Sequence, residues 1–130
     1  SNRALMLGQD LSEDELNALY ADMNHKVKES EIAYKVNASP VLNKGQMNIL
    51  FESPSINVNL LTFSVCLDDS NDILYMSKEA LLPGSSIEFI DVEKRLLPGE
   101  YKGYVSITSY HIETHEKIGE TIAEIEIYVL

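Results

Sequence analysis

The sequence contains no tryptophan, a single cysteine and no long uninterrupted hydrophobic run. One cysteine, Cys66, cannot form a disulfide within the chain. The low cysteine count does not indicate whether the protein is intracellular or exported, because many exported bacterial domains contain few cysteines. A membrane-spanning helix needs about 20 consecutive apolar residues, and no run approaches that length. We therefore expect no internal disulfide and no direct insertion of this segment into a membrane.

Positive charge is also scarce. The chain has 10 Lys and Arg residues against 21 Asp and Glu residues, which gives a formal net charge of -11. Nucleic acids and anionic membranes repel such a surface, so we expect neither as a partner. The acidic residues are spread over all segments and form no tail, so the simplest interpretation is that they keep the protein soluble.

The chain also lacks an initiating methionine and begins at Ser1-Asn2. That dipeptide is typical of the remnant of a cleaved purification tag, and no signal peptide follows it. We expect an upstream signal or anchoring segment that tethers the protein to the outside of a membrane.

The first residues have the pattern of an amphipathic helix. Ser12 and Glu15 have the spacing of a capping box, which predicts a helix over residues 12–25 within an N-terminal segment 1–29. A short helix is marginal alone in water, so its apolar stripe should pack either on the remaining domain or on a partner. The stripe contains Leu16, Leu19, Tyr20 and Met23.

From residue 30 onward the apolar residues alternate with polar ones, which is typical of half-buried strands. We predict an all-β, immunoglobulin-like two-sheet β-sandwich of about seven strands over residues 30–130. A loop containing Pro40 and Gly45 should separate the first two strands, and Ile87 and Phe89 should share one face. The expected strands lie at 32–37, 47–51, 61–67, 73–77, 86–91, 101–108 and 121–129. The expected core contains Met47, Ile49, Phe51, Phe63, Val65, Ile87, Val105, Ile107, Ile125 and Ile127.

The segment Leu96–Tyr101 is the strongest indicator of this architecture. A Pro-Gly turn delivers Tyr101 to the start of a strand, as in the tyrosine corner of immunoglobulin-like sandwiches. There the phenol bonds to nearby backbone, so we expect Tyr101 to be buried with a bonded hydroxyl. Sandwiches of this kind are scaffolds more often than catalysts.

Catalytic and metal-binding patterns are sparse. His111, Glu113 and His115 would share one face of a continuing strand, and two imidazoles with a carboxylate suit zinc. However, the segment lies between two strands and must contain the turn, which should break the alternation. We therefore expect no metal, no cofactor and no catalytic residues, and we keep a metal-dependent hydrolase using this hairpin as the alternative.

The outward positions of the last two strands offer a candidate interaction face. Tyrosine supplies contact area and a hydroxyl at low entropy cost, so such a face can bind a peptide or a glycan. The alternative is that these cross-strand pairs only stabilise an exposed sheet. The candidate partner-binding residues are Tyr104, Tyr110, Ile122 and Tyr128, beside Glu120, Glu124 and Glu126.

Four segments together resemble a known group of proteins: Leu11–Leu16, Asp68–Ser77, Leu82–Glu88 and Leu97–Tyr101. Their order resembles small, uncharacterised envelope-associated proteins of Gram-positive gut bacteria, with a membrane segment before an immunoglobulin-like domain. The resemblance implies a location on the outer face of the membrane and carries no activity. That family usually has glycine where this chain has His115, which indicates a loop position there. We therefore expect a non-catalytic adhesion or interaction module that binds a protein or glycan at the cell surface.

Overall fold

A computed structural model describes residues 32–130 of the protein. The predicted helix over 12–25 lies outside the described residues, together with the segment 1–29 that contains it. Within the described part the chain is all-β: it forms nine strands and no helix. No helix in this part is long and apolar enough to cross a membrane.

The strands form one large sheet and one small one. The large sheet has seven strands in the order β5-β4-β8-β9-β1-β2-β7, and β3 pairs with β6 in the small sheet. All neighbours are antiparallel except β1 and β9, which are parallel. The strands are β1 (Val41–Asn43), β2 (Gln46–Met47), β3 (Phe51–Glu52), β4 (Leu60–Leu67), β5 (Ile73–Met76), β6 (Ser86–Ile87), β7 (Ile90–Asp91), β8 (Gly99–Tyr110) and β9 (Lys117–Val129).

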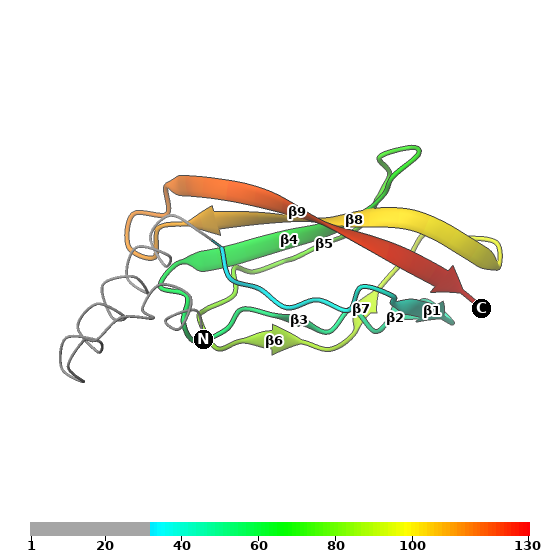
Figure 1. Cartoon of the computed structure of the whole chain (residues 1–130), viewed down its shortest axis with the longest axis horizontal. Coiled ribbons are helices and arrows are strands. Elements are labelled where there is room, and N and C mark those ends of the chain that lie inside the picture. The colour runs from blue at the N-terminus through cyan, green and yellow to red at the C-terminus, as the bar shows by residue number, and fades with distance from the viewer. Residues whose placement is uncertain (1–31) are drawn as a thin grey trace, which may run out of the picture.

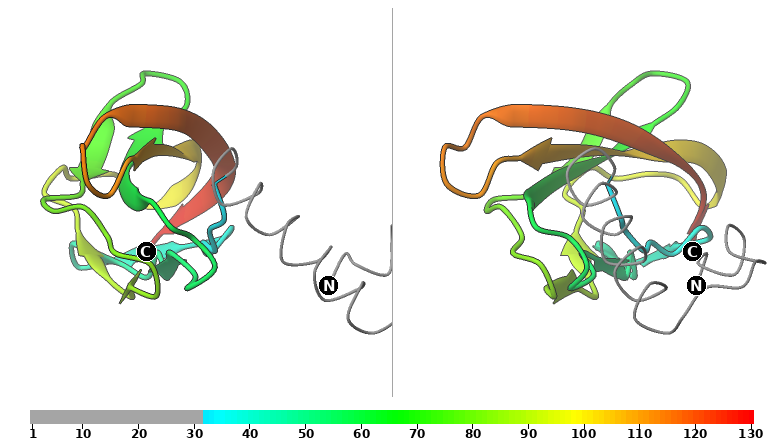
Figure 2. Two further views of the ribbon diagram at one scale, coloured as in Figure 1. Left: turned by 90° about the vertical axis from the view of Figure 1, so that its left-hand side faces the viewer. Right: turned by 60° about the vertical axis from the view of Figure 1, so that its left-hand side comes forward.

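The arrangement is sandwich-like, with a sheet that curls until it nearly closes. Strands β9, β8, β4 and β5 form one layer, and β1, β2, β3, β6 and β7 form the other (Figure 1). The end-on view shows how the large sheet bends from one layer into the other through the β9–β1 pair (Figure 2). The prediction of an all-β sandwich is therefore confirmed at this level. The number of strands is higher than predicted, nine instead of about seven.

The long hairpin of β8 and β9 is the frame of the upper layer. Its alternation is strict: Gly103, Val105 and Ile107 are buried, and the residues between them are half-buried. Val105 pairs with Ala123 on β9 and with Val65 on β4, so that three neighbouring strands present apolar side chains to the same core. Burial of such side chains is the main stabilising contribution to the fold.

The predicted core is confirmed at nine of its ten positions, because all of those except Ile87 are buried. Ile87 is half-buried and packs against the edge of the core. Between the layers, the rings of Phe51 and Phe63 stack with their centroids 4.2 Å apart.

The expected first strand, residues 32–37, is not a strand. Lys35 alone forms a bridge with Glu52, through two backbone hydrogen bonds of 3.0 and 2.8 Å. The expected loop after it contains a hairpin of β1 and β2 instead. Lys44 and Gly45 turn the chain there with positive φ angles of 52° and 79°, which suit a two-residue hairpin.

Two predicted strands are each broken in the middle. Leu50 has a φ of 45°, and this kink divides residues 47–51 into β2 and β3, which pair in different sheets. Residues 86–91 also divide, without a positive φ, into β6 and β7, which pair in different sheets. As a result Ile90 is buried, whereas Phe89 is 56% exposed. The prediction that Phe89 shares a face with Ile87 is wrong because the alternation changes phase at the break.

The predicted tyrosine contact is present. The hydroxyl of Tyr101 donates a hydrogen bond of 2.7 Å to the carbonyl of Leu97. The bonded hydroxyl is therefore confirmed. The burial is only partial, because Tyr101 lies near the open end of the sheet and is half-buried against the core.

Candidate functional site

The histidine hairpin forms a compact loop between β8 and β9. The backbone N–H of His111 donates to Glu116 at 2.8 Å, and the N–H of His115 donates to the carbonyl of His111 at 2.8 Å. His115 has a φ of 64°, the left-handed conformation of a turn residue. The predicted break in the alternation is thus confirmed.

The imidazole of His111 forms hydrogen bonds within this turn. Its Nδ1 accepts hydrogen bonds from the backbone N–H groups of Glu113 and Thr114, at 3.2 and 3.3 Å. Among residues 32–130 no group of three His, Cys, Asp or Glu side chains could hold a metal ion. The hairpin therefore gives the hydrolase alternative no positive support.

The four predicted partner-binding residues lie on the outer face of β8 and β9 but do not form one patch. Tyr104 and Ile122 are diagonal neighbours, because Tyr104 pairs with Glu124 and Ile122 pairs with Ser106. Tyr110 lies about 20 Å further along the strand at the hairpin end. Tyr128 pairs with position 100, about 13 Å from Tyr104 in the opposite direction. The face is a long stripe with Tyr104 and Ile122 at its centre.

Tyr104 is held in place by its neighbours. Its hydroxyl donates to Asn71 Oδ1 at 3.0 Å, so the side chain reaches from β8 toward the β4–β5 loop. Burial raises the pKa of the Tyr104 phenol, and a hydrogen bond with Cys66 raises it further. Cys66 occupies an outward position, as predicted, yet it is only 4% exposed because it lies beside Tyr104 and Ser64.

The outer face is acidic. On β9 the outward positions carry Glu120, Ile122, Glu124 and Glu126 in turn, so three of these four side chains are carboxylates. Lys117 bridges Glu120 at 2.8 Å, and this hydrogen bond raises the pKa of the Lys117 ammonium. Glu124 pairs across the hairpin with Tyr104, which brings no positive charge to it. Lys102 pairs with Glu126 and lies diagonal to Glu124, so the centre of the face combines apolar contact area with negative charge that one lysine offsets in part.

A second surface, which sequence reasoning missed, lies between the two edges of the large sheet. Strands β5 and β7 come close without pairing, and a hollow of about 520 Å³ lies between them. Three of its lining residues are exposed apolar side chains: Ile73, Met76 and Phe89. No local pattern could have indicated this seam, because it arises from the way the sheet curls.

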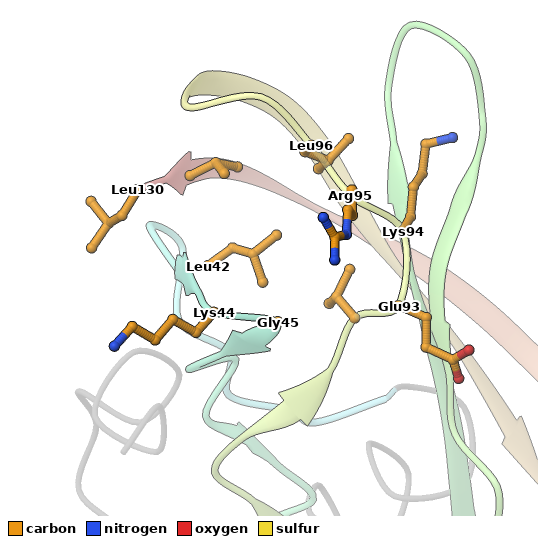
Figure 3. A pocket seen from close by; sticks show the side chains of 10 residues that line it. Leu42, Lys44, Gly45, Glu93, Lys94, Arg95, Leu96 and Leu130 are labelled. Carbon is orange, nitrogen blue, oxygen red and sulfur yellow. The ribbon is translucent and has the colours of Figure 1, made fainter.

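A separate hollow, of about 490 Å³, lies at the end of the molecule near the C-terminal residue (Figure 3). Leu42 and Val129 are buried residues of its lining. The guanidinium of Arg95 points inward, whereas Lys44 points away from the hollow (Figure 3). Lys94 forms an ion pair with Asp72, with Nζ 3.2 Å from Oδ2, and this contact lowers the pKa of the Asp72 carboxyl. The hollow therefore combines one inward-pointing cationic side chain, that of Arg95, with buried apolar residues in its lining.

Comparison of the chain with protein-family models and with curated protein sequences gives no match. Function must therefore be argued from these surfaces themselves.

Proposed function

We propose that the protein is a non-catalytic interaction module with an immunoglobulin-like domain, which binds a protein or glycan through the outer face of β8 and β9. Three features support the immunoglobulin-like assignment: the two layers, the parallel pairing of β1 with β9, and the Tyr101–Leu97 hydrogen bond at the start of β8. Such sandwiches provide rigid strands on which contact residues are held in fixed positions.

The observation that carries the proposal is the character of the central stripe. Ile122 is 61% exposed on a regular strand, and it lies diagonal to Tyr104. Contiguous exposed apolar area rimmed by charge is typical of interaction sites, and here Ile122 and the half-buried Tyr104 supply that area. Since Glu124 and Glu126 flank Ile122 on one side, a protein that presents Lys or Arg fits this face better than an acidic or neutral one.

The location is also part of the proposal. We place the module on the outer face of a Gram-positive membrane, tethered by an upstream segment, on the resemblance of its sequence motifs to envelope-associated proteins. Fractionation of the source cells, with an antibody against residues 32–130, tests this placement. Recovery of the protein in the cytosolic fraction would contradict it.

The binding face is tested by substitution on the stripe. We would identify partners by cross-linking to the intact protein and then measure the affinity of each purified partner. Ile122→Lys, alone and with Tyr128→Ser, should weaken binding at least about tenfold, because it places a charge at the centre of the contact. Ile122 was chosen over Tyr104 because Tyr104 also bonds to Asn71.

Leu97→Lys is the matched control. Leu97 is an even more exposed apolar side chain, 79% against 61% for Ile122, and it lies outside the stripe, so its substitution should leave the affinity unchanged. Binding should also weaken with added salt if Glu124 and Glu126 contribute. A partner whose affinity is equal for the wild type and Ile122→Lys would show that the contact lies elsewhere.

A further inference from the structure

The large sheet has two free edges that face each other across a hollow. Within the described residues β5 pairs only with β4, and β7 pairs only with β2. An unpaired strand edge presents a row of backbone donors and acceptors that can template another strand. Here two such rows lie on opposite sides of one space.

The direction of the backbone groups follows from the hydrogen bonds already made. The N–H of Ser77 donates to the carbonyl of Phe63 at 2.8 Å, so Ser77 faces β4. Since neighbouring residues of a strand face opposite sides, the N–H and carbonyl of Met76 point into the seam. Met76 accordingly pairs with Ser64 as a position that does not exchange hydrogen bonds.

The same reasoning applies across the hollow. The N–H of Val92 donates to Gly45 at 2.8 Å, and the carbonyl of Glu88 accepts from Leu50 at 3.0 Å. Both residues therefore face β2 and β3. The alternate residues, Phe89 and Asp91, direct their backbone groups toward β5.

The side chains around the seam suit an apolar ligand. Ile73, Met76 and Phe89 are 55%, 61% and 56% exposed, and all three line the hollow. Tyr75 lies between the seam and the core, with its ring centroid 5.5 Å from that of Phe63. The pKa of Tyr75 is raised, first by burial and then by the charge of Asp91, which agrees with its position between the edges.

The space is long enough for a strand. A second hollow, of about 430 Å³, continues along residues 77–87 and shares Tyr75 and Lys78 with the first. Together they run beside the whole of β5 and the segment after it. A strand of six residues would cover about 20 Å of this length.

We propose that an extended segment of a partner protein adds as a strand to β5 in this seam, with apolar side chains at alternate positions and Lys or Arg between them. Backbone groups on both sides require backbone partners, which a polypeptide supplies at regular spacing. Apolar side chains of the segment would contact Met76 and Phe89. Lys78 and Lys94 balance Asp91 and Glu93 in the lining of the seam, so it is the net charge of -11 on the whole chain that favours a basic segment and opposes a second copy of this chain.

This inference rests on the proposed function only in that the protein binds a partner, and it concerns a different surface. The probe is a phage-displayed library of random twelve-residue peptides, selected on the intact protein. Selected peptides should alternate apolar and basic residues and should bind as synthetic peptides. Methylation of their alternate backbone nitrogens should weaken binding at least about tenfold, because the strand hydrogen bonds are lost.

Substitutions locate the site. Met76→Pro removes a donor that faces the seam while leaving the β4 ladder intact, and it should weaken peptide binding at least about tenfold. Phe89→Lys keeps the backbone unchanged and should weaken binding through the lost apolar contact and repulsion of basic residues. Amide NMR shifts on peptide addition should be largest at Met76, Phe89 and Asp91.

Ile122→Lys is the control on the other face and should leave peptide binding unchanged. Three results would overturn the strand-addition proposal: peptides that bind Met76→Pro and Phe89→Lys as well as the wild type, binding that survives backbone methylation, or a dimer that pairs through β5. If peptide binding is lost only in Ile122→Lys, the seam is wrong and the outer face is supported. If it is lost only in the seam variants, the seam is supported whatever the fate of the outer face.

Discussion

At the scale of single residues, Tyr101 tests the corner assignment directly. Its hydroxyl donates to the Leu97 carbonyl at 2.7 Å, and Tyr101→Phe removes only this bond. A neutral hydrogen bond of this kind contributes about 1 kcal/mol, so the free energy of unfolding in urea should fall by that amount. Tyr128→Phe is the matched control on the neighbouring strand and should cost less than about 0.5 kcal/mol, because it is an ordinary surface substitution. If the free energy of unfolding falls equally in the two variants, the Tyr101–Leu97 hydrogen bond makes no specific contribution to stability.

Gly103 is a position where the packing admits no side chain. A Cβ built there would lie 2.7 Å from the carbonyl oxygen of Cys66 and 2.9 Å from Cδ1 of Ile127. The first of these neighbours is backbone of β4 that pairs with β8 on one side and β5 on the other, so it cannot move without disturbing both contacts. Gly103→Ala should therefore destabilise the protein by about 1–3 kcal/mol in denaturant unfolding, as overpacked cores do.

Gly119→Ala serves as its control, because nothing lies within 4 Å of a Cβ at Gly119 on the same hairpin. This substitution should be neutral or slightly stabilising, since alanine restricts the unfolded chain more than glycine does. A Gly103→Ala variant as stable as Gly119→Ala would mean that the strands separate easily at this point.

At the scale of elements, the β8–β9 hairpin has a turn that its sequence fits poorly. His115 adopts a φ of 64°, which side chains with a Cβ adopt at a cost. His115→Gly should raise the midpoint of urea unfolding, with a gain of up to about 1 kcal/mol. His115→Val should lower it, because a β-branched residue is the least suited to this conformation. A loss of stability in both variants would indicate that the imidazole itself stabilises the loop.

Elements with strict alternation were predicted well from the sequence, and the broken ones were not. The long strands β4, β8 and β9 have one buried face, so their period of two is visible in the residues. β2 and β3 belong to one apolar run that is divided by the positive φ of Leu50. Leucine has no preference for a positive φ, so the residue type at this position does not predict the kink. Very short strands such as β1 depend on pairing with distant parts of the chain, here with Val129 and Tyr128 of β9.

The candidate sites differ in the same way. The outer face follows from alternation, and the sequence therefore placed Tyr104, Tyr110, Ile122 and Tyr128 on it. Alternation does not give distances along a strand, so the spread of these residues over a long stripe emerged only from the register. Cys66 was correctly assigned to the outward side, but its cover by Tyr104 required knowledge of the neighbouring strand.

At the scale of the whole molecule, a curled sheet leaves distinct surfaces with different chemistry. The outer face of β8 and β9 is acidic and regular, whereas the seam between β5 and β7 has free backbone groups and apolar side chains. A flat, covered sheet would have neither. The strand-addition proposal therefore depends on the incomplete closure of the fold, whereas the outer-face proposal depends on the alternation of β8 and β9.

The charge of the whole molecule makes a last prediction, on its response to salt. A formal charge of -11 destabilises the compact state through self-repulsion. The described exposed ion pairs, Lys94–Asp72 and Lys117–Glu120, oppose this only weakly, since such pairs contribute little each. Raising NaCl from about 0.02 M to about 0.3 M should therefore increase the free energy of unfolding, because screening weakens the repulsion more than the pairs.

Part of this repulsion should arise where three carboxylates, of Asp68, Glu124 and Glu126, line one shallow hollow with a single cation, Lys102. In the double variant Asp68→Asn with Glu124→Gln, the gain on adding salt should be smaller than in the wild type. The measurement is the urea midpoint at the two salt concentrations, repeated in KCl to separate screening from a specific effect of sodium. A wild type that loses stability as salt is added would mean that the ion pairs dominate, and that the acidic surface imposes no cost on the fold.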